Sequence, residues 1–458
     1  MAKILTLVLA ASQATALAVP TELNKRQSSG ISSMLGSLLG SGSSSASSGG
    51  VVDLITASVT GGLGHFMGEE KATDSLTAFA KLLGATRTAP GGLGPWTATT
   101  MNAGYGTIPA PAGSVERQVT MKSRTDVPGA KTIKVRYGPY SIPSSKKKNM
   151  LGEMGMLSNF PHTNMAKPCE GDCTIMGMNA GLEYLNGTNA NIDSGLWLHH
   201  MVLFNNGPGR EDPPCANRDV SVPHVTVGAT SHSSERIFAS GNERTVGVWP
   251  DWGVKDAGYK LKKEDKFAAL VELMNENPED KQVWMTMTYD IVDGHPFKDD
   301  IKIIWFDVRQ CGTSEVNPPK GKNQFTLNYK WNATYDAEVI GSIEHLHDGG
   351  NRMTLELDGK PVCDSMTEYG TKPEYIGMAA APGAAAGGHN HGGAGMKHIS
   401  EQKVCHGPTL AQKSVKKGQL WNLNAYYDFD KNKGNAHADG EWDEVMGIAI
   451  MFVRVKGT

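Results

Sequence analysis

The sequence predicts an all-β protein with two antiparallel, jelly-roll-like β-sandwich domains behind a disordered N-terminal leader. From about Lys131 onward, short runs of alternating apolar and polar residues are separated by turn residues, and long patterns of helical spacing are nearly absent. Runs of this kind form strands that bury one face against a second sheet. With 39% apolar residues in 458, the chain can fill cores of this size.

The first 26 residues resemble export signals rather than folded structure. Residues 1–18 combine Lys3, an apolar stretch and a cleavage region with small residues at Ala16–Ala18. This combination is typical of a secretory signal peptide. Residues 19–26 end in Lys25-Arg26, which resembles a fungal propeptide-processing site. We therefore expect a secreted, extracellular protein. No later apolar run approaches the roughly 20 residues of a membrane helix, so we expect no membrane partner.

Residues 27–114 form the predicted leader. Its residues 27–50 are rich in Ser and Gly and cannot bury enough apolar surface to fold. One short amphipathic helix is expected at 73–83, where Leu76, Phe79 and Leu83 are spaced helically before Gly84.

The strands that follow divide into two domains. The first predicted strand begins near Ile133 and ends before Gly138-Pro139. The run 312–323 is rich in Gly, Pro and Lys and is the best linker candidate, so we expect sandwich domains at 115–310 and 311–458. The other predicted strands share the same alternation and occupy residues 283–291, 301–306, 325–329, 353–357 and 445–453.

Charge and cysteine content narrow the function classes. A formal net charge of -3 is close to balanced, which argues against nucleic acid as a partner. The six cysteines of an exported chain predict three disulfides rather than a thiolate metal site, because no Cys-x-x-Cys pair is present. Asn186 and Asn332 lie in glycosylation sequons.

Two histidine pairs are the candidate metal ligands. His199 and His200 are neighbours in an apolar run, so on a regular strand they point to opposite faces and cannot grip one ion. Either the strand is irregular there, or one imidazole binds, or both are hydrogen-bonded core residues. His345 and His347 are two apart and share a face, so one ion can bridge them. Met446 stands before a third strong strand and is either core filler or a thioether ligand.

Taken together and in this order, these elements resemble the copper type II, ascorbate-dependent monooxygenases, the family of peptidylglycine α-hydroxylating monooxygenase and dopamine β-monooxygenase. The resemblance covers about residues 130–455, and the Leu-His-His and His-Leu-His-Asp-Gly-Gly patterns are closer to stress-up-regulated nodulin-like relatives in plants and fungi. It implies two separated coppers. His199 and His200 would hold an electron-transfer copper, whereas His345, His347 and Met446 would hold the copper that meets dioxygen.

The resemblance also implies a cofactor chemistry and a disulfide pattern. Imidazoles accept both oxidation states of copper, and a thioether favours Cu(I), so this ligand set suits a centre reduced by ascorbate and oxidised by dioxygen. A family disulfide brackets the first histidine pair, which implies Cys173–Cys215. With it we expect Cys363–Cys405 in the second domain and Cys169–Cys311.

The sequence departs from the family in two places. The family's third histidine for the electron-transfer copper has no counterpart in 270–275, where Met274 is the nearest chemical substitute. The positions that grip a peptide carboxylate in the peptidylglycine enzymes hold Ile343, Ile448 and Ile450. A carboxylate would be desolvated there without a partner, so a peptide substrate is not expected.

The sequence leaves two functions open. One is a monooxygenase that hydroxylates a small non-peptide substrate, and the other is a non-catalytic extracellular copper-binding or stress-associated protein. The histidine-containing segment 387–406 either captures copper or covers the second site, or is a solvated insertion of low complexity. The sequence predicts neither the substrate nor the oligomeric state.

Overall fold

The computed structural model describes residues 101–149, 153–218, 221–377, 389–390, 395–437 and 441–457. The predicted signal peptide, propeptide and helix 73–83 lie outside the described residues, as does the leader up to residue 100. The chain divides into two compact units, residues 1–94 with 219–230, and residues 95–218 with 231–458. Within the described part of the first unit, α6 (Val222–Thr226) is a short helix in which Ser221 Oγ lies 2.7 Å from His224 Nδ1.

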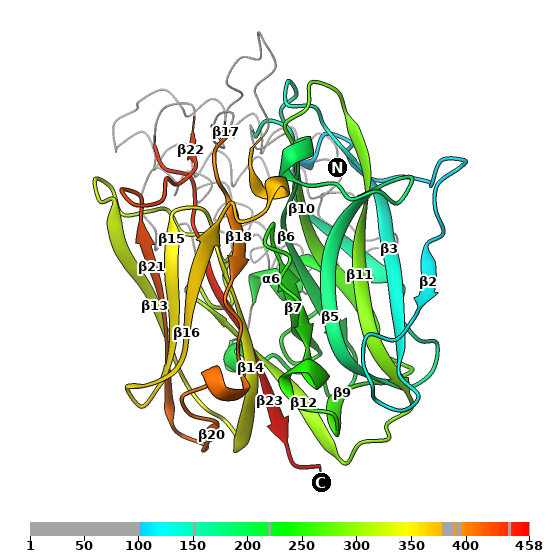
Figure 1. The fold of residues 1–458 in the computed structure, drawn as a ribbon, viewed down its shortest axis with the longest axis vertical. Helices are drawn as coiled ribbons and strands as arrows, with labels where there is room; N and C mark the ends of the chain where they lie inside the picture. The colour runs from blue at the N-terminus through cyan, green and yellow to red at the C-terminus, as the bar shows by residue number, and fades with distance from the viewer. Residues whose placement is uncertain are drawn as a thin grey trace, which may run out of the picture. The chain divides into compact units, whose positions relative to one another are not determined.

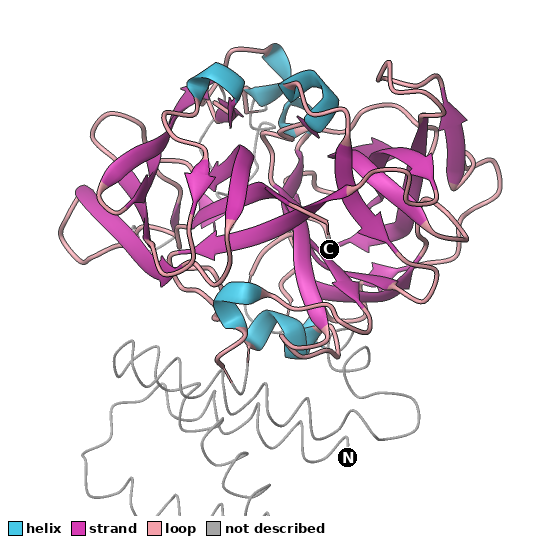
Figure 2. Cartoon of the chain, turned by 90° about the horizontal axis from the view of Figure 1, so that it is seen from below, coloured by secondary structure: helices cyan, strands magenta, loops and turns pink. Residues whose placement is uncertain are grey.

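The predicted all-β class is confirmed in the larger unit, which consists mainly of antiparallel strands (Figures 1 and 2). A twelve-stranded sheet has the order β1-β3-β11-β5-β9-β12-β23-β14-β19, with β2, β8 and β20 pairing at its sides. Its strands are β1 (Gly106–Thr107), β2 (Gln118–Met121), β3 (Lys131–Ile142), β5 (Cys173–Tyr184), β8 (Gly247–Val248), β9 (Ala257–Leu261), β11 (Lys281–Asp293), β12 (Asp299–Asp307), β14 (Ala337–Leu346), β19 (Cys405–His406), β20 (Ser414–Val415) and β23 (Gly447–Val455).

Two smaller sheets pack against parts of the large one. The four-stranded sheet has the order β4-β10-β6-β7, and its strand β10 contacts β3. The five-stranded sheet has the order β13-β21-β15-β16-β18, and its strand β21 contacts β23. Their strands are β4 (Met156–Met165), β6 (Leu196–Asn206), β7 (Ser234–Ser240), β10 (Lys266–Asn275), β13 (Gln324–Asn332), β15 (Gly350–Leu357), β16 (Lys360–Tyr369), β18 (Ile399–Gln402) and β21 (Leu420–Asp428). In addition, β17 (His389–Asn390) pairs with β22 (Ala436–His437).

Burial explains why the strands differ in their sequence patterns. Strand β13 alternates between exposed and partly buried positions, as expected for a strand with one face in water. Strand β6 is buried along almost its whole length, which matches its nearly continuous apolar run. One apolar core, which includes Phe306, Trp421 and Met451, lies between the five-stranded sheet and the neighbouring part of the large sheet.

Strand β23 joins the two halves of the large sheet. It pairs antiparallel with β12 from Asp300↔Val455 to Asp307↔Ile448, and on its other side with β14. The strands that carry the two predicted domains are thus hydrogen-bonded into one sheet. The boundary between 115–310 and 311–458 stays a prediction.

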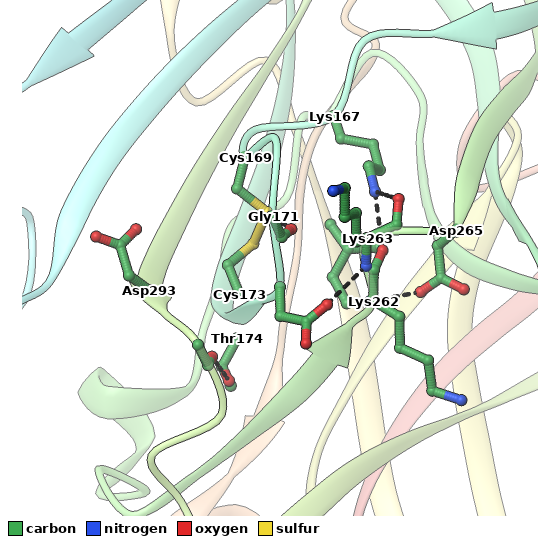
Figure 3. The surroundings of a disulfide bond; sticks show 12 residues. Lys167, Cys169, Gly171, Cys173, Thr174, Lys262, Lys263, Asp265 and Asp293 are labelled. Atoms are coloured by element: carbon green, nitrogen blue, oxygen red, sulfur yellow. Dashed lines mark hydrogen bonds between the residues drawn. A yellow bond between two sulfur atoms is a disulfide. The ribbon is translucent and has the colours of Figure 1, made fainter.

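The disulfide pattern corrects two of the three predicted bonds. Cys363–Cys405 is confirmed, but Cys169 is bonded to Cys173 and Cys215 to Cys311. Cys169 precedes β5 on a turn held by the ammonium of Lys167, which donates to the carbonyls of Lys262 and Lys263 (Figure 3). This turn brings Cys169 close to Cys173. Cys215 is bonded instead to Cys311, which follows β12. No described helix is long and apolar enough to cross a membrane.

Candidate metal centre

A β-bulge in β6 makes the strand irregular at the adjacent residues His199 and His200. His200 pairs with Glu272 of β10, whereas the next pair is Leu198 with Leu273, so His199 is an extra residue in β6. A bulge places two residues of one strand opposite one residue of its neighbour and re-aims their side chains. The imidazoles of His199 and His200 accordingly lie 5.4 Å apart, centre to centre, and tilted by 46°.

The second pair lies at the end of β14, where each imidazole is anchored through Nδ1. His345 Nδ1 lies 2.9 Å from Oε1 of Glu243, and His347 Nδ1 lies 2.8 Å from the carbonyl of Glu444. The chain then turns at Gly349, whose φ of +92° is a left-handed conformation that favours glycine. A Cβ there would also lie 2.3 Å from the ring of Phe429.

The structure brings the two histidine pairs together. The ring centroids of His199 and His347 lie 5.0 Å apart, and those of His345 and His347 lie 5.5 Å apart. The candidate ligand nitrogens of His199, His200 and His347 all lie within 4.8 Å of one another. The resemblance implies two separated coppers, whereas here imidazoles from both pairs form one group.

Met446 lies beside the backbone of His347. It directly precedes Gly447, which pairs with Leu346, and its side chain is buried. The hydroxyl of Tyr427 accepts a hydrogen bond from the His347 amide at 3.1 Å and donates one to the Met446 carbonyl. Tyr427 therefore fixes the spacing of these two segments. Whether the Met446 thioether is a ligand stays a prediction.

Met274 is part of a buried apolar cluster, and its role as a substitute ligand stays a prediction. It pairs with Trp197 across the sheet and packs with Met156, Ile192 and Tyr375. The residue of this region that reaches the histidines is Glu272, whose Oε1 lies 2.9 Å from Nδ1 of His199.

Glu272 is held in place from β4. Asn159 has a left-handed backbone conformation, with φ of +40°. Its backbone N–H donates a hydrogen bond to Oε2 of Glu272 at 3.0 Å. The side-chain oxygen of Asn159 lies 3.3 Å from Nε2 of His200. The Glu272 carboxylate thus lies beside both imidazoles of the first pair.

Burial and neighbouring charges set the protonation of the group. Burial lowers the pKa of His200 to about 4, with the charges of His199 and His345 adding to the effect. Burial and the same neighbouring imidazoles also lower the pKa of His347 well below its usual value. For His199, burial is outweighed by the hydrogen bond and charge of Glu272, and its pKa rises. Neutral His200 and His347 are the forms that can bind a metal.

A cavity beside the group contains a third anchored histidine. His398 is buried, its Nδ1 lies 2.6 Å from Oδ2 of Asp348, and its ring packs edge-on against Trp197 at 4.5 Å. The cavity is lined by His398 together with His345 and His347, and the Nε2 atoms of all three are buried without a hydrogen-bond partner. Metal-binding histidines show the same arrangement, with one nitrogen held by a carboxylate or carbonyl and the other directed at the ligand.

The donor set fits copper. Three imidazoles whose nitrogens converge, with a carboxylate beside them, are ligands that copper accepts in proteins. Of these three, His347 is oriented by the Glu444 carbonyl at its Nδ1. At the adjoining cavity, Glu243 and Asp348 hold His345 and His398 in the same way.

Sequence reasoning missed Glu272, Glu315 and His398. Glu272 sits in a run that resembles an ordinary strand, and only its pairing opposite His200 reveals its role. Glu315 lies in the predicted linker, and its carboxylate lies within 4.8 Å of the candidate donor atoms of His200 and Glu272. His398 lies in the segment 387–406, for which the sequence leaves copper capture, a cover over the second site and a solvated insertion all open. Its partner is Asp348, part of the His-Leu-His-Asp pattern. His389 lies in β17, and His391 lies outside the described residues.

Comparison with known proteins assigns the chain to a family of oxygenases. No family model matches the sequence. Over 284 residues the chain is 30% identical to the probable copper-dependent oxygenase clz3 of Cochliobolus lunatus, covering 61% of this chain and 79% of that protein. Over 335 residues it is 28% identical to the probable copper-dependent oxygenase M1 of a Phoma species, covering 71% of this chain and 72% of that protein. The chain belongs to this family of copper-dependent oxygenases.

Solved structures add nothing further to this assignment. A structure of N-glycanase F covers 75% of this chain and 96% of its own, at 9% identity and a TM-score of 0.29. A likeness this low carries no argument about fold or function.

Proposed function

We propose that the protein is a secreted copper-dependent monooxygenase that hydroxylates a C–H bond of a small, non-peptide substrate with dioxygen and a reductant such as ascorbate. The observation that carries the proposal is the convergence of His199, His200 and His347 beside one cavity. Membership of the chain in a family of copper-dependent oxygenases supports the metal and the reaction class.

The residues that would hold copper are His199, His200 and His347, with His345 and Met446 as the further ligands that the sequence predicts. Copper bound there supplies one-electron redox chemistry and a binding position for dioxygen. The finer assignment to the copper type II, ascorbate-dependent class rests on the order of the histidine pairs and Met446. The number of copper ions is part of the proposal.

Neighbouring acceptor groups orient the imidazoles for metal binding. Glu243 and the Glu444 carbonyl accept the Nδ1 protons of His345 and His347, so each Nε2 carries a lone pair toward the cavity. Burial excludes water from these lone pairs. Glu272 stabilises the protonated form of His199 and raises its pKa until a metal replaces the proton.

The proposed class of substrate is inferred from the side chains that surround the histidine group. Ile343 pairs with Ile450, His345 pairs with Ile448, and these three isoleucines are buried. They provide no cation for a peptide carboxylate, which supports a non-peptide substrate. The cavity itself presents the Oδ1 atoms of Asn242 and Asn435, buried and without partners. A small molecule with hydrogen-bond donors, such as hydroxyl groups, matches these acceptors.

A second candidate is a non-catalytic extracellular copper-binding protein. The observation that favours it is Glu272, which lies 2.9 Å from His199 and offers an oxygen ligand suited to Cu(II). In that case the site would bind copper without turnover.

The deciding experiment combines copper counting with ascorbate-driven oxygen uptake in a screen of small hydroxylated and phenolic substrates. We expect copper in the purified mature protein, loss of copper in His347→Ala, and substrate-dependent uptake by the wild type. The control is His406→Ala, because His406 stacks on Trp252 at 5.6 Å and is not in the histidine group. Full copper content in His347→Ala contradicts the site, and copper binding without any substrate-dependent uptake favours the binding protein.

A further inference from the structure

A second set of possible metal ligands adjoins the imidazole group. One candidate donor atom each from His200, Glu272 and Glu315 lie within 4.8 Å of one another. They come from β6, from β10 and from the segment between β12 and β13. His200 belongs to both groups, so the two carboxylates lie directly beside the proposed copper ligands.

A backbone bridge in the predicted linker positions Glu315 beside His200 and Glu272. Val316 and Val445 form a bridge in which each amide donates to the other residue's carbonyl at 2.9 Å. The residue before Val316 is Glu315, and the residue after Val445 is Met446. The linker therefore runs beside the segment that carries Glu444 and Met446. The carboxylate of Glu315 in the linker is part of the site.

Glu272 and Glu315 place two carboxylates beside one imidazole. Carboxylates held together in a buried place are costly unless protons or a metal compensate them. His200 is only 6% exposed, and its Nδ1 is buried without a hydrogen-bond partner. Nε2 of the same ring lies 3.6 Å from Oε2 of Glu272, so His200 directs one nitrogen at the carboxylates.

We propose that Glu272, Glu315 and His200 bind a second, divalent metal ion next to the copper of the proposed function, on whose position this inference rests. Carboxylate oxygens suit harder ions than Cu(I), so the ion is of the Zn²⁺ or Mn²⁺ class. Soft Cu(I) goes to the imidazole group. His200 has two ring nitrogens, so it can offer one to each ion.

The test uses the difference between the two ions. Metal-free protein is loaded anaerobically with one equivalent of Cu(I), freed of excess copper, and titrated with Zn²⁺ by calorimetry, and both metals are counted by mass spectrometry. Wild type should bind one Zn²⁺ per chain, and Glu315→Gln should lose it while keeping Cu(I). Glu153→Gln is the matched control, since Glu153 is a nearby carboxylate whose oxygen accepts from Asn149 at 2.7 Å and lies outside both groups.

The outcomes separate this inference from the proposed function. Absence of Zn²⁺ binding in wild type overturns the second site, and so does undiminished Zn²⁺ binding by Glu315→Gln. His347→Ala, which lacks one imidazole of the other group, should lose Cu(I) and still bind Zn²⁺. Retention of Cu(I) by His347→Ala would count against the copper centre alone, because the Zn²⁺ titration still decides the carboxylate site.

Discussion

The Oε1 atom of Glu243 lies 2.9 Å from Nδ1 of His345, although 102 residues separate the two in sequence. The hydrogen bond fixes which nitrogen of His345 carries the proton and which one faces the cavity. The charge of His345 in turn lowers the pKa of Glu243 against the opposing effect of burial. A buried pair of this kind sets the geometry of a metal ligand although the carboxylate does not itself touch the metal.

Replacing Glu243 by Ala should weaken copper binding about 10- to 100-fold, because the orienting acceptor of His345 is lost. Competition with a copper chelator measures the change. Glu401→Ala is the control, since Glu401 is an exposed residue on β18. Equal copper affinity in the two variants would show that His345 is not a ligand.

Gly241→Ala should disturb the same imidazole by steric contact. A Cβ at Gly241 would lie 2.5 Å from Cε1 and 3.0 Å from Nδ1 of His345, so the ring has to move. We expect reduced copper content with the strand signal in circular dichroism retained. Gly171→Ala should bind copper normally, because no atom lies within 4 Å of a Cβ at Gly171. Normal copper content in Gly241→Ala as well would argue against a role of His345.

Glu344 should make the metal-free protein less stable as the pH rises. Burial raises its pKa from 4.5 in the unfolded chain to about 8 in the folded protein. Its contribution to stability is therefore fully present below pH 4.5 and is lost as the pH rises through 8. The loss is about 5 kcal/mol at most, from roughly 1.36 kcal/mol per pKa unit. Urea unfolding at pH 5 and pH 9 measures it, and Glu344→Gln should show a correspondingly smaller pH dependence; an unchanged dependence would refute the assignment.

The two disulfides that differ from the expected pattern should differ in their contribution to stability. Cys215–Cys311 closes a loop over 96 residues, whereas Cys169–Cys173 spans only 4. The entropy of loop closure predicts a loss of about 4 to 5 kcal/mol for the paired change Cys215→Ser with Cys311→Ser, and about 2 kcal/mol for Cys169→Ser with Cys173→Ser. Urea unfolding of both variants compares them. Peptide mapping without reduction checks the pairing itself, and recovery of a Cys173–Cys215 peptide would refute it.

The sequence was sufficient for the fold class, and it singled out the two histidine pairs that the structure brings together. Strand patterns such as Val283–Ile291 are local, since alternation follows from one residue facing the core and the next facing away. The convergence of His199 with His347 depends on a bulge and on pairing between strands far apart in sequence, and neither has a local signature. The pairing of Cys173 with Cys215 rests on the resemblance to the copper type II monooxygenases and is wrong, because here the turn at Cys169 brings that cysteine to Cys173.

Charged residues near the centre were the hardest to assign from sequence. Glu272 and Glu315 resemble an ordinary strand residue and a linker residue until the register of β10 and the Val316–Val445 bridge are known. The role of His398 is hidden because its partner Asp348 is 50 residues away. Long-range contacts of this kind determine the chemistry of a site without changing the local pattern of hydrophobicity.

The position of β23 has a consequence for the order in which the molecule is made. Among the described strands it alone pairs with both β12 and β14, and it follows every other described strand in the sequence. During synthesis the earlier strands leave the ribosome first, but the sheet that unites them lacks its middle strand until β23 has emerged. We therefore expect the histidines of β6 and β14 to be held together late in synthesis, so that assembly of the metal centre is a late step of maturation.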